Sequence, residues 1–371
     1  MKRSSRLAVF AGTTLALGAI AAAGITAASP GEHRASSVGA ADGTTWPIVQ
    51  SSPTADTGTS LSGLAAAPDG TMWAAGGRQA SGVYKPILQR LTGSTWSNVT
   101  LPAAAAPYRF NAAAATSASN LWLAAQLNTS GDSHAVLQWN GTAWKTFKVP
   151  LSFQPSDIAT AGPGSTWVVS SSAAKHWNGT AWADTPIGIK PRAITAVSPT
   201  SAWAVGWAEG QPATAHWNGT SWTNVPFPRI DGVDVKSEIA STLSDVYAAS
   251  ANDVWAVGSV RVIDESGQKV SRSLLAHWNG TAWSNVLGAP GTYLTKVASD
   301  GAGGIWVSAG ANMRHRTAAG VWSDESLAQP TGTKAIPSEL ALRPGTTTMW
   351  AVGWTSTDAT RWADLAHWRS N

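Results

Sequence analysis

Small and bulky apolar residues alternate along several short segments of the chain. In Ala202–Gly206, which reads Ala-Trp-Ala-Val-Gly, the bulky side chains fall on one face and the small ones on the other. This period of two predicts β-strands, and a turn of Pro, Ser, Asp, Asn or Gly precedes each of them. Seven such segments recur 36 to 52 residues apart, a spacing typical of propeller blades. Their tryptophans are Trp73, Trp122, Trp167, Trp203, Trp255, Trp306 and Trp350.

A second repeat, His-Trp-Asn-Gly-Thr-Ala-Trp, predicts a tight hairpin after each of these strands. Asn-Gly is the pair that most readily takes positive φ at both central positions of a type I′ turn. A two-residue loop at Asn178 and Gly179 would pair Trp177 with Thr180 and place both tryptophans of the copy on one face. The copies are His176–Trp182, His277–Trp283, His216–Trp222 with Ser for Ala, 138–144 with Gln for His, and the degenerate segments 91–96 and 316–322.

The two repeats together predict a unit of four antiparallel strands, A to D, which is one propeller blade. The seventh unit ends after 365–368 without a strand D, and the N-terminal segment 42–50, which contains Trp46, has no strand C before it. An open array would instead need polar caps at both ends. The predicted fold is therefore all-β, a seven-bladed β-propeller of four-stranded blades, with the ring closed by the N-terminal strand completing the last blade.

The chain resembles the seven-bladed, kelch-like β-propellers that secreted bacterial proteins build from Trp-Ala-Val-Gly and His-Trp-Asn-Gly-Thr-x-Trp repeats. The resemblance covers residues 42–371 and implies a fold without an assigned activity. The segment Asp69-Gly-Thr-Met-Trp73 is spaced differently from a sialidase Asp-box, and no Arg-Ile-Pro motif occurs. The galactose oxidase cofactor needs a Tyr-Cys crosslink, which a chain without cysteine cannot form.

The N-terminal segment has the pattern of a secretory signal. Lys2, Arg3 and Arg6 precede the uncharged run Leu7–Ala27, and small residues follow before Pro30. We expect a signal peptide at 1–28, a flexible linker at 29–41 and the propeller at 42–371, so that the protein is secreted and extracellular. An uncleaved membrane anchor is the alternative, because the run is long enough to span a bilayer. Without cysteine, a secreted chain has to fold without disulfides.

Charge and composition limit the partners of the mature chain. The formal charge of +4 falls to +1 once the three basic residues of the signal are removed, so we expect no nucleic-acid binding. After loss of the signal we also expect no membrane contact, and a monomer. The Asn-Gly-Thr sequons match the glycosylation pattern, but the turn already accounts for them.

Few residues suggest catalysis or metal binding. His176, His216, His277 and His367 occupy one position of the repeat, with His315 as a fifth member, and we interpret them as structural, with metal ligation or base catalysis as the alternative. The acidic pairs of Asp231 with Asp234, Asp264 with Glu265, and Asp324 with Glu325 lack EF-hand spacing. The first two pairs fall in long insertions, 226–242 and 258–273. We predict no catalytic residue, no metal and no cofactor.

One face of the propeller should carry the variable loops. Connections from strand B to C and from D to A emerge there, and variable loops on a rigid scaffold are where binding is usually built. We call it the loop-rich face. The candidate binding residues are Tyr108, Arg109, Lys190, Arg192, Trp207, Tyr293 and Trp354.

Two pairs among these residues carry the binding hypothesis. Trp207 and Trp354 extend Trp-Ala-Val-Gly at the same repeat position, and an exposed indole stacks on sugars or cations; the alternative is that both only cover the blade edge. Arg109 and Arg192 precede innermost strands and should recognise an anionic group near the axis. Their alternative is local pairing with Asp157 or Asp231.

The sequence thus favours noncovalent binding of an extracellular glycan, peptide or other envelope component or protein. A hydrolase or lyase acting on an extracellular polymer is the second hypothesis, which would need two convergent carboxylates or a His-carboxylate pair in the axial pocket. A structural scaffold without a small ligand is the third. The sequence leaves open whether the protein is an enzyme, although its residues favour binding over catalysis.

Overall fold

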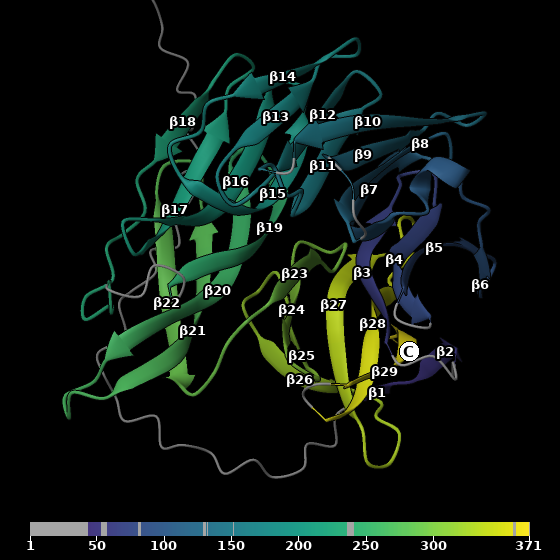
Figure 1. Ribbon diagram of the computed structural model, residues 1–371. Helices are drawn as coiled ribbons and strands as arrows, with labels where there is room; N and C mark the ends of the chain where they lie inside the picture. The colour runs from purple at the N-terminus through teal and green to yellow at the C-terminus, as the bar shows by residue number, and fades with distance from the viewer. Residues whose placement is uncertain are drawn as a thin grey trace, which may run out of the picture. The chain divides into compact units, whose positions relative to one another are not determined.

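The computed structural model describes residues 44–52, 58–80, 83–128, 131, 133–150, 152–235, 241–358 and 361–370. The predicted signal peptide and linker lie outside these residues. Apart from one short 3-10 turn, η1 (Ala103–Ala105), the described elements are strands, which form seven sheets (Figure 1). The architecture is an all-β, seven-bladed propeller, as the repeats predict.

Each blade is numbered by its order in the chain, and its strands run from the axis outward. Blade 1 has β3 (Thr59–Ala66), β4 (Met72–Ala80), β5 (Val83–Thr92) and β6 (Thr95–Asn98). Blade 2 has β7 (Tyr108–Ser117), β8 (Asn120–Leu127), β9 (Ser133–Trp139) and β10 (Trp144–Pro150). Blade 3 has β11 (Asp157–Gly162), β12 (Ser165–Val169), β13 (Ala174–Trp177) and β14 (Trp182–Thr185). Blade 4 has β15 (Lys190–Ser198), β16 (Ser201–Ala208), β17 (Gln211–Trp217) and β18 (Trp222–Val225).

The remaining three blades follow the same order. Blade 5 has β19 (Thr242–Ser250), β20 (Asp253–Ile263), β21 (Lys269–Trp278) and β22 (Trp283–Pro290). Blade 6 has β23 (Lys296–Ser299), β24 (Ile305–Ala309), β25 (Asn312–Arg316) and β26 (Trp322–Leu327), with β1 (Thr45–Trp46) added outside β26. Blade 7 has β27 (Lys334–Leu342), β28 (Met349–Asp358), β29 (Arg361–Arg369) and β2 (Ile48–Ser52). The seven repeat tryptophans all lie on the second strand of their blade, as predicted.

The innermost strands converge on one axis, as Figure 1 shows. Each packs against the innermost strand of the next blade, and β27 packs against β3, so the ring is closed. The Gly of Trp-Ala-Val-Gly permits this arrangement because the innermost strand bulges over it. A Cβ at Gly206 would lie 2.0 Å from the Lys190 carbonyl oxygen, and one at Gly258 would lie 2.1 Å from the Thr242 carbonyl oxygen.

The N-terminal segment closes the ring, but it does so in two pieces. β2 completes blade 7 by pairing antiparallel with β29, as predicted. β1 instead runs parallel to β26 of blade 6, where Trp46 is fully buried. The single strand predicted through Trp46 is therefore wrong: Pro47, which has no N–H to donate, separates the two pieces.

Tryptophans repeat the same contact between neighbouring blades. Edge-to-face pairs form between Trp96 and Trp350, Trp182 and Trp122, Trp283 and Trp203, and Trp46 and Trp306. Their ring centroids lie 5.1 to 5.7 Å apart, in the range that aromatic pairs prefer. In the first three pairs, one tryptophan belongs to the second strand of a blade and the other to the outer strand of the next, whereas Trp46 lies on β1, which pairs with blade 6. Trp46 thus packs as the outer tryptophan of blade 7 would.

The Asn-Gly hairpins are real, but their predicted turn type is wrong. Trp177 pairs directly with Trp182, so the loop has four residues and both indoles share a face as expected. Gly179 has a positive φ, but Asn178 does not. The Asn178 side chain instead accepts hydrogen bonds from the backbone N–H groups of Thr180 and Ala181, at 3.0 Å each. The repeat requires Asn because its side chain closes the loop.

The repeat histidines have a structural role. The rings of His176, His277 and His315 stack on the second-strand tryptophan of their own blade at 4.0 to 4.5 Å, and His216 lies 4.6 Å from Trp203 at a tilt. Each of these four rings also hydrogen-bonds a Ser or Asp side chain. His367 is different, because Arg369 takes its place opposite Trp350 and His367 stacks on Trp96 of blade 1. The equivalence predicted for His367 is therefore wrong.

Candidate functional site

Blade 1 leaves a small pocket at the loop-rich end of its innermost strands. Blades 4 and 7 carry Trp207 and Trp354 four residues after the repeat tryptophan, whereas blade 1 has Gly77 there. The missing side chain opens a pocket of about 180 Å³, which we call the blade-1 pocket. A Cβ added at Gly77 would meet the Arg109 Cβ at 3.3 Å. The pocket is lined by Ser60, Ser62, Gly77, Tyr84, Arg109, Phe110, Asn111 and Trp354.

Arg109 is the charged residue of this pocket. Its Nε and Nη2 donate to Gln126 Oε1 at 3.2 and 2.7 Å, and its guanidinium carbon lies 5.9 Å from the centre of the Tyr84 ring. Asn111 Nδ2 donates to the same Gln126 oxygen and to the Pro155 carbonyl. The guanidinium is therefore held in place by neutral groups and keeps its positive charge for an incoming anion.

The structure brings some predicted residues together and removes others from the surface. Arg109 and Trp354 line the same pocket, with Tyr84, which was not predicted. Trp207, however, exposes only 6% of its surface, so the expectation of an exposed indole is wrong there. Tyr108 is fully buried and accepts a hydrogen bond from Lys148 Nζ, so it does not face the channel mouth.

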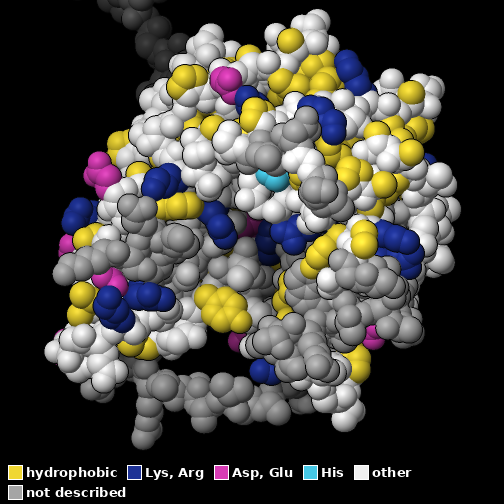
Figure 2. Space-filling view, viewed as in Figure 1, with side chains coloured by type: hydrophobic (Ala, Val, Ile, Leu, Met, Phe, Trp, Pro, Cys, Tyr) yellow, Lys and Arg dark blue, Asp and Glu magenta, His cyan; other side chains and the backbone are white. Residues whose placement is uncertain are grey.

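Lys190, Arg192 and Tyr293 stay accessible. Lys190 and Arg192 are exposed on β15, with Lys190 Nζ 5.9 Å from the centre of the Trp207 ring, and Tyr293 exposes 50% of its surface. In Figure 2, Lys and Arg side chains gather around the hollow at the centre of the face in view. Within the described residues, no ion pair joins Arg109 or Arg192 to Asp157 or Asp231, and Arg109 instead donates to Gln126.

The second long insertion forms part of blade 5. Residues 258–273 belong to β20 and β21, which continue as a hairpin to a turn at 264–268, and Val233 bridges to Val262 beside it. Asp234 is 3% exposed and pairs with Lys269 Nζ at 2.7 Å. Asp234 therefore supports the hairpin, and it does not lie among the residues that line the axis.

The structure shows a set of charged residues near the axis that the sequence did not predict as a site. In every blade, the residue two positions after the repeat tryptophan pairs with a residue of the innermost strand. That innermost residue lies ten positions before the tryptophan in the sequence, or eleven in blade 7. We call these seven positions the axial layer. They are Gly63, Ala112, Asp157, Ala193, Asp245, Lys296 and Glu339. The fixed offset from the tryptophan was the signal in the sequence that could have revealed them.

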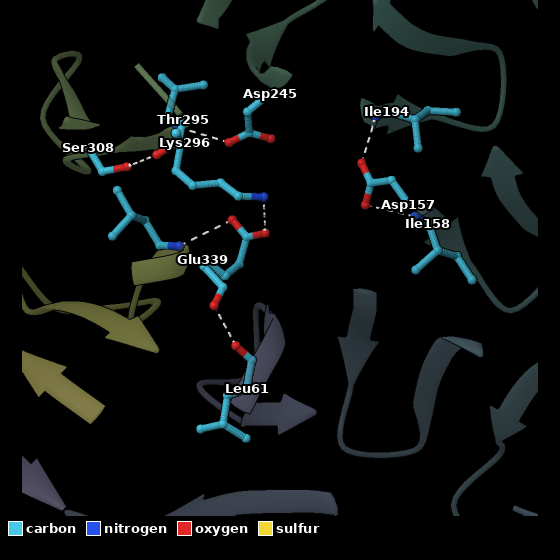
Figure 3. Close-up of polar contacts among 12 residues, drawn as sticks. Leu61, Asp157, Ile158, Ile194, Asp245, Thr295, Lys296, Ser308 and Glu339 are labelled. Carbon is cyan, nitrogen blue, oxygen red and sulfur yellow. Dashed lines mark hydrogen bonds and ion pairs between the residues drawn. The ribbon is translucent and has the colours of Figure 1, made fainter. Parts of the chain in front are cut away.

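Polar contacts in the axial layer link neighbouring blades (Figure 3). Lys296 Nζ donates to Glu339 Oε2 at 2.7 Å. Asp157 accepts the backbone N–H groups of Ile158 and of Ile194 in the next blade, at 2.8 Å each. Asp245 Oδ2 accepts the Val297 N–H of blade 6 at 2.8 Å.

The pKa values of this layer are strongly perturbed. Burial raises the pKa of Asp157 to about 7 and that of Asp245 to about 8, although Lys296 acts to lower both. Burial alone would lower the pKa of Lys296, but the carboxylates of Glu339, Asp245 and Asp157 raise it above its usual range. The layer therefore holds a cation, Lys296, and two carboxyls, Asp157 and Asp245, that titrate near neutrality.

An axial cavity of about 340 Å³ lies beside this layer. Asp157, Asp245 and Glu339 line it, together with apolar side chains such as Leu64, Val246 and Leu340. Its further lining residues include Ser299, Leu342 and Pro344, which lie at or after the ends of innermost strands. The cavity therefore extends from the axial layer away from the loop-rich face.

Comparison with known proteins adds the fold and nothing finer. No family model matches the chain, and no curated protein matches its sequence. Solved structures do match: U3-55K (14% identity, 86% of this chain and all of that one, TM-score 0.59), YCF48 bound to a D1 peptide (15%, 89% and 96%, 0.55) and YCF48 from Cyanidioschyzon merolae (13%, 87% and 98%, 0.54). At such identities the likeness supports a β-propeller, a fold typically used for binding.

Two absences also bear on the site. No group of three or more His, Asp or Glu side chains within the described ranges could hold a metal ion. The same ranges contain no helix long and apolar enough to cross a membrane.

Proposed function

We propose that this chain is a secreted binding protein that recognises an anionic group of an extracellular glycan, peptide or other envelope component on the loop-rich face. The observation that carries the proposal is the blade-1 pocket. It combines a guanidinium, Arg109, with two aromatic rings, Tyr84 and Trp354, and with hydroxyl and amide groups. Guanidinium forks suit carboxylates and phosphates, and aromatic rings suit sugar faces or apolar side chains.

The surroundings of the pocket support an anionic ligand. Arg192 and Lys190 lie exposed on β15 of the same face, and basic side chains surround the central hollow in Figure 2. Long-range attraction from such a rim raises the rate at which an anion arrives. The solved structure of YCF48 with a D1 peptide is one propeller with a bound peptide, and a peptide carboxylate is among the anionic groups that a guanidinium can bind.

The test is a binding screen of the exported protein against oligouronates, their neutral oligosaccharide counterparts, acidic peptides and phosphorylated cell-wall fragments. Arg109→Ala is compared with Arg314→Ala, in which the lost arginine pairs with Asp324 on outer strands. We expect the first variant to lose roughly ten- to a hundredfold in affinity for the anionic ligand, because a charged hydrogen bond contributes about 1.5 to 3 kcal/mol. The control should bind as the parent does.

Two outcomes would contradict the proposal: equal affinity of Arg109→Ala and the parent, or preference for the neutral oligosaccharides. The hydrolase hypothesis is followed in the same samples by measuring new reducing ends, because Asp157, Asp245 and Glu339 do line one cavity. Secretion is tested separately by N-terminal sequencing of exported protein. A chain that still begins at Met1 would contradict cleavage of the signal.

A further inference from the structure

We propose that the axial cavity is a second binding site, which takes a small organic cation of the alkylammonium class with its charged group against Asp245 and Asp157. This site is distinct from the blade-1 pocket and does not depend on the function proposed for it. Its volume of about 340 Å³ lies within the range of small-molecule pockets.

The charge balance of the cavity favours a cation. Three carboxyls line it, and Lys296, the cation of the axial layer, pairs with Glu339. Within the described residues, Asp157 and Asp245 form no ion pair and accept hydrogen bonds only from backbone N–H groups. Two carboxyls of the cavity are thus without a cationic partner of their own. A bound ammonium would supply that charge.

Asp245 gives the most specific indication of a cationic ligand in the axial cavity. It exposes only 9% of its surface, and one of its oxygens, Oδ2, is held by the Val297 N–H. No hydrogen bond to the other oxygen, Oδ1, occurs among the described residues, while the side chain lines the cavity. Figure 3 shows the free oxygen of Asp245 directed toward the central space between Asp157 and Lys296. Because Oδ1 is open to the cavity and no group of the described residues donates to it, a ligand or water there can supply the donor.

The walls indicate what the rest of the ligand should be. Leu64, Val246, Leu340 and Ala341 line the cavity, and Tyr247 adds an aromatic ring. Apolar walls with a charged end suit a ligand with a short alkyl body and one ammonium group. A metal ion fits less well, because no three acidic or histidine side chains of the described residues are close enough to bind one.

The probes are n-butylammonium, tetramethylammonium and n-butanol, titrated calorimetrically into the full chain near pH 9, where Asp157 and Asp245 are ionised. We expect saturable binding of n-butylammonium and at least tenfold weaker binding of n-butanol, which has the same alkyl body without the charge. Tetramethylammonium should fall between them, because it has the charge but no N–H donor for Asp245 Oδ1. The affinity for n-butylammonium should rise from about pH 6 to 9 as Asp157 and Asp245 lose their protons.

Asp245→Asn is the decisive variant, since its amide oxygen can still accept the Val297 N–H. We expect it to weaken n-butylammonium binding at least tenfold, whereas Asp231→Asn, at an exposed acid outside the cavity, should have no effect. Ala341→Leu, which narrows the cavity, provides a second test that leaves the charges unchanged and should also weaken binding. Equal affinity for n-butanol, no saturable binding, or parental affinity in Asp245→Asn would each overturn the proposal.

Discussion

The outer parts of the blades and the axial layer follow opposite rules. In the outer parts, the same edge-to-face tryptophan pair occurs four times, and four of the seven blades place a histidine ring against the second-strand tryptophan. At the axis, one equivalent position holds Gly, Ala, Asp, Ala, Asp, Lys and Glu in turn. Where every blade meets the same packing problem, the repeat is kept.

The axial layer is less constrained because four of its positions, Ala112, Asp157, Asp245 and Glu339, line a cavity. The blade-1 pocket likewise lies beside a variable position, where blade 1 has Gly77 and blades 4 and 7 carry tryptophan. Both the axial cavity and the blade-1 pocket therefore lie at positions where the blades differ in sequence. Residues that keep the repeat are expected to affect stability, and residues that break it are expected to affect binding.

The largest expected effect comes from breaking the closure. Deleting residues 44–52 removes the fully buried Trp46 and the strand that pairs with β29. It should lower the free energy of unfolding by more than the roughly 3 to 5 kcal/mol that one buried aromatic contributes. Denaturant titration measures this, with Thr45→Ala as the control at an exposed site. A deletion variant as stable as the parent would show that the ring is not closed by this segment.

A smaller effect concerns His367, the histidine that breaks the pattern. Burial lowers its pKa from 6.5 to about 4, so the folded chain favours the neutral ring. The buried neutral ring contributes fully to the free energy of unfolding above about pH 6.5. As the pH falls toward 4, this free energy should decrease by roughly 3 kcal/mol at most. Stability measured across this range should depend less on pH in His367→Leu than in the parent. An unchanged pH dependence would contradict the burial of this ring.

Asp245 in the axial layer should make stability depend on pH in the opposite direction to His367. The pKa of Asp245 is raised to about 8, so its protonated form is favoured on folding, and stability is lost as the pH rises from about 4 to 8. Asp245→Asn should remove this loss, and its stability relative to the parent should therefore increase toward pH 8. Asp231→Asn is the control. A constant difference between Asp245→Asn and the parent from pH 5 to about 8 would mean that the carboxyl is ionised throughout.

Much of this fold could be predicted from spacing, because the repeat tryptophans directly report the second strand of each blade. The closure at Pro47 and the four-residue loop at Asn178 could not, since both depend on local hydrogen bonding that the pattern of apolar residues does not show. For the site, Arg109 and Trp354 were found through their repeat positions. The burial of Trp207 was not predicted, because it depends on three-dimensional packing that the repeat does not show. Asp245 was not predicted, because its position opposite the second strand is recognised only when the sequences of all seven blades are aligned on their repeat tryptophans.

The most direct test of the central claim measures stability and binding together in two variants. Arg109→Ala breaks the blade-1 pocket, and Trp122→Ala breaks an outer contact of a fully buried ring with Trp182. Affinity for the anionic ligand found in the screen should fall roughly ten- to a hundredfold in Arg109→Ala, with a stability change below about 1 kcal/mol. Trp122→Ala should lose about 3 to 5 kcal/mol of stability and bind normally while folded. Parental affinity in Arg109→Ala, or lost affinity in folded Trp122→Ala, would contradict this division of roles.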